Sequence, residues 1–161
     1  MWAKNKQSGF TIVELLIVIV VIGVLAAITI VTYSGIQDRA RYAAYRSDIE
    51  SMNKAILLYY IDNGTYPVTG CITNGATGTG DFIPGLVPKY LPKIPPVPNW
   101  LSGTNYYAYC ASAGGVDYKV LRLVTVAAGS VPAVELSGNQ NIDPVRGNRA
   151  WGYWSTDGSG L

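Results

Sequence analysis

Residues 8–33 have the sequence SGFTIVELLIVIVVIGVLAAITIVTY, in which one acidic residue interrupts an otherwise apolar run. The run extends from Phe10 to Val31, which is 22 residues. At about 1.5 Å per residue, a helix of this length measures roughly 33 Å, enough to cross a bilayer core of about 30 Å. A signal-peptide core needs only about 7–15 apolar residues. The sequence therefore predicts a membrane-spanning helix.

The residues before this run set its predicted orientation. Lys4 and Lys6 precede it, with no acidic residue near them. Positive residues stay on the cytoplasmic side, so we expect the amino end in the cytoplasm and the remainder of the chain exported. Cys71 and Cys110 then lie outside the cell, where a disulfide can persist.

Glu14 is the feature that a plain membrane anchor does not explain. An ionised acid within a span is costly unless it is paired, so it is a functional hypothesis by default. One interpretation places Glu14 near the cytoplasmic interface, within reach of water. The other requires a cation inside the apolar layer. Since the run contains no Lys or Arg, that cation would be a new amino terminus, created by cleavage before Phe10.

The stretch SGFTIVELLIVIVVIGVLAA, residues 8–27, closely resembles the amino-terminal signature of type IV pilins and the related pseudopilins. The resemblance implies that a prepilin peptidase cuts after Gly9 and methylates the new terminal residue, Phe10. It also implies that Glu14, fifth in the mature chain, promotes filament assembly by pairing with the Phe10 amine of a neighbouring copy. Pairing would relieve the cost of burying the carboxylate and would fix the register of the copies.

The helical pattern continues beyond the membrane run, but with a single apolar side. Apolar residues recur at steps of three and four, and the helix should end at Asn63-Gly64. Its first half must be buried in lipid or against other copies, and its second half against its own downstream domain. The apolar positions of the second half are Tyr33, Ile36, Ala40, Ala43, Tyr45, Ile49, Met52, Ile56 and Tyr59.

Two connecting segments are expected after the helix. Residues 64–80 are rich in glycine and threonine and predict a loop. Residues 83–100 carry six prolines and predict an extended connection over the head, with inward-packing residues Leu86, Tyr90, Leu91 and Ile94. The alternative for this segment is a proline-rich ligand for an aromatic groove on a partner.

The remaining sequence predicts a small antiparallel sheet. Strands are expected at 105–112, 118–126 and 133–136, forming a meander with one face on the helix and one in water. The tail, 137–161, should be rich in turns, with Trp151, Tyr153 and Trp154 as anchors.

The predicted fold class is therefore α+β, a pilin-type fold with a long amino-terminal helix packed on a small antiparallel sheet. The expected segments are a cytoplasmic leader (1–9), a transmembrane and assembly helix (10–32), the amphipathic helix of the head (33–63) and a globular head (64–161).

Cys71 and Cys110 could close a loop of about forty residues, which would stabilise the head by about 3–4 kcal/mol. Two free buried thiols are the alternative. No cofactor and no enzymatic activity are expected, because the chain has no histidine and no phosphate-binding loop. A calcium site in a loop remains open, although its acids Asp81, Asp117, Asp143 and Asp157 are scattered. A net charge of +2 gives no case for nucleic-acid binding.

The favoured function is a structural subunit of a type IV pilus, a surface filament for adhesion, motility or DNA uptake. The chain would lie in the cytoplasmic membrane, in contact with lipid, before assembly and in an extracellular filament of its own copies afterwards. Its partners would be the prepilin peptidase, the assembly platform and a cytoplasmic ATPase. The alternatives are a pseudopilin of a type II secretion or competence system and, from another class, a membrane-anchored extracellular binding domain.

Overall fold

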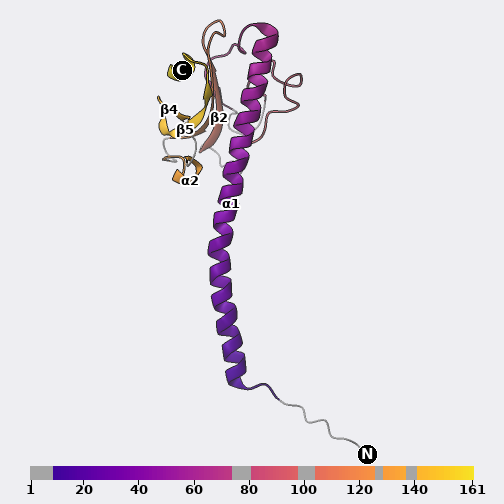
Figure 1. Cartoon of the computed structure of the whole chain (residues 1–161), viewed down its shortest axis with the longest axis vertical. Helices are drawn as coiled ribbons and strands as arrows, with labels where there is room; N and C mark the ends of the chain where they lie inside the picture. The colour runs from indigo at the N-terminus through magenta and orange to yellow at the C-terminus, as the bar shows by residue number, and fades with distance from the viewer. Residues whose placement is uncertain (1–8, 74–80, 98–103, 126–128, 137–140) are drawn as a thin grey trace, which may run out of the picture. The chain divides into compact units, whose positions relative to one another are not determined.

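The computed structural model describes residues 9–73, 81–97, 104–125, 129–136 and 141–161. The chain divides into two compact units, Met1–Asp38 and Arg39–Leu161, which we call the stalk and the head. The elements are α1 (Ile12–Asn63), β1 (Ile72–Thr73), β2 (Asn105–Ala111), β3 (Tyr118–Val124), α2 (Ala133–Leu136), β4 (Ile142–Asp143), β5 (Gly147–Trp154) and the 3-10 helix η3 (Gly158–Gly160) (Figure 1). A long amino-terminal helix and an antiparallel sheet confirm the predicted α+β class.

Helix α1 ends where the sequence predicted. Gly64 adopts a left-handed conformation, with φ of 74°, and its N–H donates to the carbonyl oxygen of Tyr60 at 2.8 Å. Glycine adopts this conformation without the Cβ clash that other residues meet, so it is a common helix terminator.

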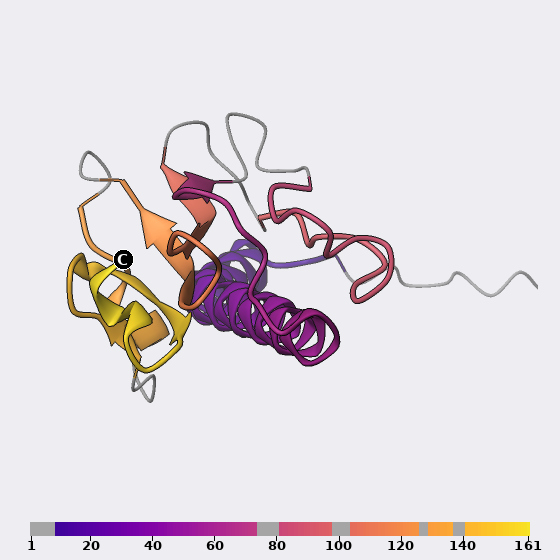
Figure 2. The ribbon, with the colours of Figure 1, turned by 90° about the horizontal axis from the view of Figure 1, so that it is seen from above.

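The core of the head lies between α1 and one face of the sheet. Tyr45, Ile49, Met52 and Ile56 are buried on α1 and pack against the sheet, whose strands lie to one side of the helix (Figure 2). Fully burying one such aliphatic side chain contributes about 1.5–3 kcal/mol. The sheet supplies the other half of this core through Tyr107, Tyr109, Tyr118, Val120, Val124 and Trp151.

The amphipathic half of the helix was predicted to be buried along one side from Tyr33 onward, but its first predicted positions are exposed. Tyr33 and Ile36 are 60% and 59% exposed, and Ala40 and Ala43 are exposed as well. Within the head, the first buried side chain of α1 is that of Tyr45. Within the head only the later turns of α1 carry buried side chains, so periodicity alone overestimates the buried length of the helix.

The sheet has five strands in the order β1-β2-β3-β5-β4 among the described residues, and its neighbouring strands are antiparallel. The predicted hairpin of β2 and β3 is present, with Tyr107 opposite Arg122. The predicted third strand at 133–136 is wrong, because this segment forms α2. The N–H groups of Glu135 and Leu136 both donate to the carbonyl oxygen of Pro132. Proline has a φ angle that suits a helix start, and Ala133, Glu135 and Leu136 are strong helix formers.

The predicted turn-rich tail is also wrong in its main part, because it contains β5. This strand pairs with β3, and Trp151 is buried while Tyr153 and Trp154 are partly buried, as expected of anchors. Gly152 is required by close approach: a Cβ there would overlap the carbonyl oxygen of Val120. Gly152 therefore indicates close packing of the backbones of β3 and β5 and does not indicate a turn.

The sheet face turned away from α1 is not simply in water, contrary to the prediction. Ala108, Leu121 and Ala150 are buried there in a second, smaller cluster. Lys119 is fully buried on the same side of β3 by contacts with β4 and the carboxyl-terminal residues.

The connection between helix and sheet packs as expected but is not extended throughout. Leu86 and Ile94 are buried, and Tyr90 and Leu91 are partly buried against the core. Residues 84–90 form consecutive turns, in which the Tyr90 N–H donates to the Leu86 carbonyl oxygen at 3.0 Å. The end of this connection and residues 74–80 of the glycine-rich loop before it lie outside the described residues, and the described part of that loop ends in β1.

Candidate functional site

The first turn of α1 is closed by reciprocal hydrogen bonds between Thr11 and Glu14. The Glu14 backbone N–H donates to Thr11 Oγ1 at 3.2 Å, and the Thr11 backbone N–H donates to Glu14 Oε2 at 2.9 Å. The Thr11 hydroxyl also donates to Glu14 Oε2, at 2.7 Å. This arrangement is a capping box, which satisfies two N–H groups that would otherwise lack partners at a helix start.

Thr11 is a site residue that the sequence reasoning missed. The signal was present, since TIVE at residues 11–14 has the spacing of a capping box before an apolar run. Glu14 therefore has a structural part within a single copy: it helps to set where α1 begins.

Gly9 and Phe10 immediately precede this capped turn. Both are exposed, and the Phe10 side chain is 80% exposed. The predicted cleavage point thus lies in non-helical chain that a protease can approach. The structure brings the predicted residues Gly9, Phe10 and Glu14 into one short segment. Because the Phe10 nitrogen is still in a peptide bond here, it carries no charge, and the cation predicted to pair with Glu14 forms only on cleavage.

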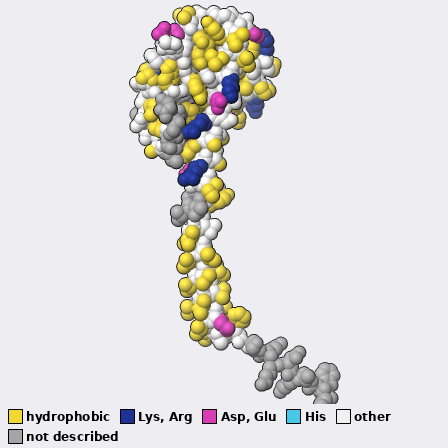
Figure 3. Space-filling model, in the orientation of Figure 1, with side chains coloured by type: hydrophobic (Ala, Val, Ile, Leu, Met, Phe, Trp, Pro, Cys, Tyr) yellow, Lys and Arg dark blue, Asp and Glu magenta, His cyan; other side chains and the backbone are white. Residues whose placement is uncertain are grey.

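The stalk presents apolar side chains around its helix. Among the described residues, α1 is a helix long and apolar enough to cross a membrane by length and composition, and none of its most apolar window is buried. In Figure 3 hydrophobic side chains cover the visible face of this segment. An exposed apolar surface of this kind needs a cover from outside the chain, either lipid or other proteins. Its most exposed large side chains include Phe10, Ile12, Val13, Leu15, Ile19, Ile22, Leu25, Ile28 and Ile30.

In the head, a disulfide joins Cys71 and Cys110 across 39 residues of sequence. Cys71 directly precedes β1, and Cys110 lies in β2, to which β1 pairs. The bond therefore fastens the short edge strand to the sheet. Closing a loop of this length stabilises a fold by about 4 kcal/mol in the chain-entropy account.

A buried ion cluster organises the carboxyl-terminal part of the head. Lys119 Nζ lies 3.0 Å from Asp143 Oδ1 and donates to the carbonyl oxygens of Ser159 and Leu161. Arg146 Nη1 donates to Asp143 Oδ2 at 2.8 Å. Burial opposes ionisation of Asp143, but the Arg146 and Val145 N–H donors and Lys119 outweigh it and lower its pKa.

The acids considered for calcium do not converge in the described part of the chain. There, no group of three or more His, Cys, Asp or Glu side chains could hold a metal. Asp143 is held by Lys119 and Arg146, whereas Asp117 accepts a hydrogen bond from the Ser155 hydroxyl at 2.8 Å.

Comparison with known proteins matches both parts of the chain. Residues 4–30 match the family described as "Prokaryotic N-terminal methylation motif". The Type II secretion system core protein G of Pseudomonas aeruginosa is 34% identical over 112 residues, covering 67% of this chain and 76% of that protein. The protein of the same name from Pectobacterium carotovorum is 28% identical over 148 residues, covering 86% and 87%.

Other relatives match a shorter part of the chain. The Type II secretion system core protein G of Aeromonas hydrophila is 38% identical over 66 residues, which are 41% of this chain. The chain spans about half the length of that relative, 46%. No solved structure matches the chain.

These relatives favour the pseudopilin alternative over the type IV pilus subunit that the sequence analysis preferred. The amino-terminal motif is shared by both groups, but the similarity to the Pseudomonas aeruginosa protein continues well into the head. The chain belongs to the family of type II secretion system core protein G, a pseudopilin family related to the type IV pilins.

Proposed function

We propose that this chain is a non-enzymatic structural subunit of a filament in a type II secretion system. A prepilin peptidase would cut after Gly9 and methylate Phe10, and the mature chain would polymerise through its stalk. The observation that carries the proposal is the exposed apolar surface of the stalk from Phe10 to Ile30, a range that contains a single acid, Glu14. The names of the relatives support the secretion setting.

The proposed assembly step is the pairing of Glu14 with the Phe10 amine of a neighbouring copy. A carboxylate moved from water into an apolar bundle of helices is costly unless a cation meets it. The capping box fixes the position of this carboxylate, because Oε2 is held by Thr11. In the described part of the chain Oε1 has no hydrogen-bond partner, so it is available to a second donor.

Before assembly the stalk would be covered by the cytoplasmic membrane, with the amino end inside, and afterwards by the stalks of other copies. Both covers are apolar, so transfer from lipid to filament needs no large change in hydrophobic burial. Specific pairing of charges then decides which register forms. The assembly platform and its ATPase would supply the energy for moving subunits out of the membrane.

The test is to express the full chain with a prepilin peptidase and a type II secretion apparatus lacking its own core protein G. Glu14→Ala should give chain that has lost residues 1–9 but forms no sheared filaments and restores no export. Glu50→Ala is the matched control, since Glu50 is an exposed acid on the same helix that pairs with Lys54; it should assemble normally. Filaments at normal yield from Glu14→Ala would overturn the proposal.

The same chain, expressed in a second host that lacks its own pilin, separates the two related functions. A type IV pilus subunit, supported by the shared methylation motif, would restore surface pili and twitching in a pilin-deficient host without restoring export. A membrane-anchored binding domain would keep residues 1–9 and form no filament in either host.

A further inference from the structure

Tyr60 and Tyr66 form a stacked pair of aromatic rings where α1 ends. Their ring centroids lie 4.5 Å apart, and the two ring planes are 23° from parallel. Tyr60 belongs to the last turn of α1, whereas Tyr66 follows the left-handed turn at Gly64. The Tyr66 backbone N–H donates to the Gly115 carbonyl oxygen at 2.8 Å, which anchors this segment to the turn between β2 and β3. Two anchored segments therefore hold these rings face to face.

Neither hydroxyl of the stacked pair has a hydrogen-bond partner among the residues that the structure describes. A phenol is oxidised by loss of an electron together with its proton, so the proton needs an acceptor. For Tyr60, which is 41% exposed, that acceptor is water. Tyr66 also contacts Tyr118, with ring centroids 4.3 Å apart, but Tyr118 is buried and its hydroxyl donates to Asn53 Oδ1 at 2.7 Å. The rings suited to oxidation are therefore those of Tyr60 and Tyr66.

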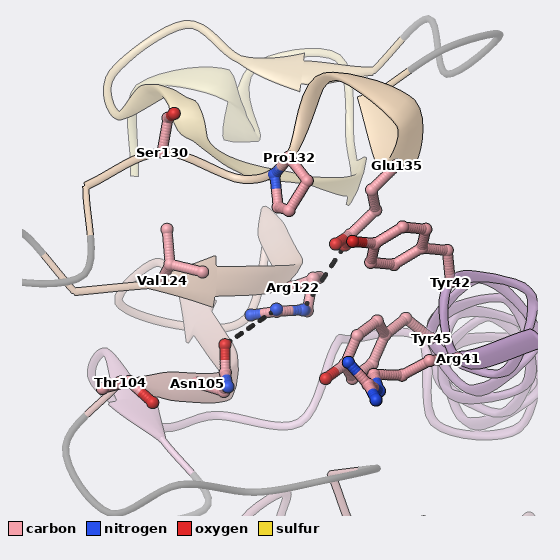
Figure 4. A pocket seen from close by; sticks show the side chains of 10 residues that line it. All are labelled: Arg41, Tyr42, Tyr45, Thr104, Asn105, Arg122, Val124, Ser130, Pro132 and Glu135. Carbon is pink, nitrogen blue, oxygen red and sulfur yellow. Dashed lines mark hydrogen bonds and ion pairs between the residues drawn. The ribbon is translucent and has the colours of Figure 1, made fainter. Parts of the chain in front are cut away.

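The pair formed by Tyr45 and Tyr107 is unsuited to oxidation. Tyr45 lines a cavity of about 330 Å³ in the head, which also contains the ion pair of Arg122 and Glu135, with 3.5 Å between Nε and Oε1 (Figure 4). The Arg122 guanidinium lies 4.3 Å from the Tyr45 ring centroid, and a positive charge there opposes removal of an electron from the ring. The two rings meet edge to face with centroids 6.4 Å apart, and the Tyr107 hydroxyl donates to Asp48 Oδ2.

The pair formed by Tyr59 and Tyr90 is a second contrast. Its ring centroids are 5.4 Å apart and its planes are 63° from parallel. The Tyr90 hydroxyl donates to Asp62 Oδ2 at 3.0 Å and accepts hydrogen bonds from Lys89 Nζ and Asn63 Nδ2. The Lys89 ammonium also lies 4.7 Å from the Tyr90 ring centroid. Both an edge-on geometry and a nearby cation therefore distinguish this pair from the stacked one.

We propose that Tyr60 and Tyr66 are a site of oxidative modification, at which a haem peroxidase and hydrogen peroxide join the two rings as dityrosine. Each phenol loses one electron and its proton, which gives two phenoxyl radicals. One ortho carbon of each ring then forms the new C–C bond. The hydrogen on each of these carbons moves through water to the phenolic oxygen, which restores both aromatic rings. The two electrons and two protons reduce one hydrogen peroxide to two water molecules.

The new bond would complement the disulfide of the head. The disulfide already fastens Cys71 to Cys110 in β2, and Cys71 follows Tyr66 by five residues. With both bonds present, the end of α1 and the sheet are linked covalently through residues 66–71. This linkage opposes local unfolding of the helix end. The site contains no residue of the stalk, so its test does not depend on filament assembly or on secretion.

The test treats the full chain in detergent micelles with a haem peroxidase and hydrogen peroxide. Dityrosine fluorescence reports the reaction, and mass spectrometry of tryptic peptides locates it after reduction of the disulfide. Tyr60 and Tyr66 lie in the tryptic peptide 55–89, whereas Tyr90 lies in the peptide 90–93. Peptide 55–89 should lose two hydrogens and give no backbone fragments between positions 60 and 66. A bond between Tyr59 and Tyr90 would instead join the two peptides and would contradict the proposal.

Single hydroxyl deletions make the assignment specific. Tyr60→Phe and Tyr66→Phe keep the stacked rings but remove a hydroxyl that the radical requires, so each should abolish the product. Neither deletion breaks a hydrogen bond, so the thermal unfolding of both variants should match that of the unaltered chain. Tyr90→Phe is the matched control and should give dityrosine in normal yield. The proposal is overturned if peptide 55–89 keeps its hydrogens, if Tyr66→Phe gives as much product as Tyr90→Phe, or if dityrosine occurs only in cross-linked dimers.

Discussion

Helix α1 contributes to both the stalk and the head, yet its apolar side chains have different surroundings in the two. In the head, Ile49, Met52 and Ile56 are fully buried against the sheet. In the stalk, Val20 and Ile22 are 55% and 59% exposed, as are their neighbours on every side of the helix. The sequence pattern shows the same difference: apolar residues lie on one side of the helix in the head and on all sides of it in the stalk. A one-sided pattern is completed within the chain, whereas an all-round pattern requires a cover from outside it.

The largest expected effect comes from placing one charge at matched exposed positions of α1. Val20→Lys should weaken retention in the membrane, because a charge at the centre of a span costs about 2.5–3.5 kcal/mol on an insertion scale and about 10–17 kcal/mol on an isolated helix. Ile61 is 75% exposed on the head, and Ile61→Lys should change its stability by no more than about 0.5 kcal/mol. Membrane fractionation and thermal unfolding measure the two effects.

The contrast between stalk and head fails if neither variant changes the property measured for it. If Val20→Lys stays in the membrane fraction as firmly as the unaltered chain, the exposed stalk is not covered by lipid.

The second effect is confined to the head. Replacing both Cys71 and Cys110 by serine should lower the free energy of unfolding of the head by about 4 kcal/mol, because the denatured chain regains the freedom of a long loop. Denaturant unfolding followed by tryptophan fluorescence measures this loss. Membrane retention should not change, since the stalk makes no use of this bond. A loss below about 1 kcal/mol would contradict this entropic role of the disulfide.

The third effect depends on pH and on the ion cluster of Asp143. Its pKa is lower in the folded head than in the unfolded chain, where it is about 3.9. The stabilisation is therefore complete above about pH 4 and is lost as the pH falls through the folded pKa. Asp143→Asn should be less stable by about 3 kcal/mol at about pH 6, because it leaves Lys119 buried without its anion.

Melting temperatures from about pH 6 to about pH 2 check this prediction. Asp143→Asn should lose less stability on acidification than the unaltered chain, and the exposed Asp157→Asn should follow the unaltered chain. Parallel acid curves for Asp143→Asn and the unaltered chain would contradict it.

The smallest expected effect concerns the start of α1. Thr11→Ala removes the hydroxyl of the capping box, and amide exchange in the first helical turn should become about fivefold faster. Thr29→Ala is the control, because the Thr29 hydroxyl donates to the Leu25 carbonyl oxygen within the helix. Hydrogen exchange of the mature chain in micelles measures both. No change in Thr11→Ala would mean that the first turn does not depend on this cap.

The stalk was predictable from sequence because its structure is local. The length of α1, its end at Gly64 and the apolar surface of the stalk follow from composition and from steps of three and four. The cap at Thr11 is equally local, because TIVE places a threonine three positions before Glu14, the spacing of a capping box.

The head was less predictable because its details depend on distant contacts. Strand β5 contains Gly147 and Gly152, which resemble turn signals, yet Gly152 is needed where the backbone of β3 approaches closely. The segment at 133–136 could form a strand or a helical turn, and in the structure its Glu135 and Leu136 N–H groups bond to the Pro132 carbonyl oxygen in a helical turn. Arg122 and Glu135 are thirteen positions apart in sequence, and only the packing of α1 and α2 on the sheet brings them together in one cavity.

The central claim is that Glu14 meets the Phe10 amine of another copy in the filament. The most direct measurement is solid-state NMR on filaments assembled from two populations of the mature chain, one labelled with 15N-phenylalanine and the other with 13C-glutamate. We predict dipolar coupling between the terminal 15N of Phe10 and the side-chain carboxyl carbon of Glu14, as expected for opposite charges within about 4–6 Å. Intact filaments in which these two labels show no coupling between copies would contradict the claim.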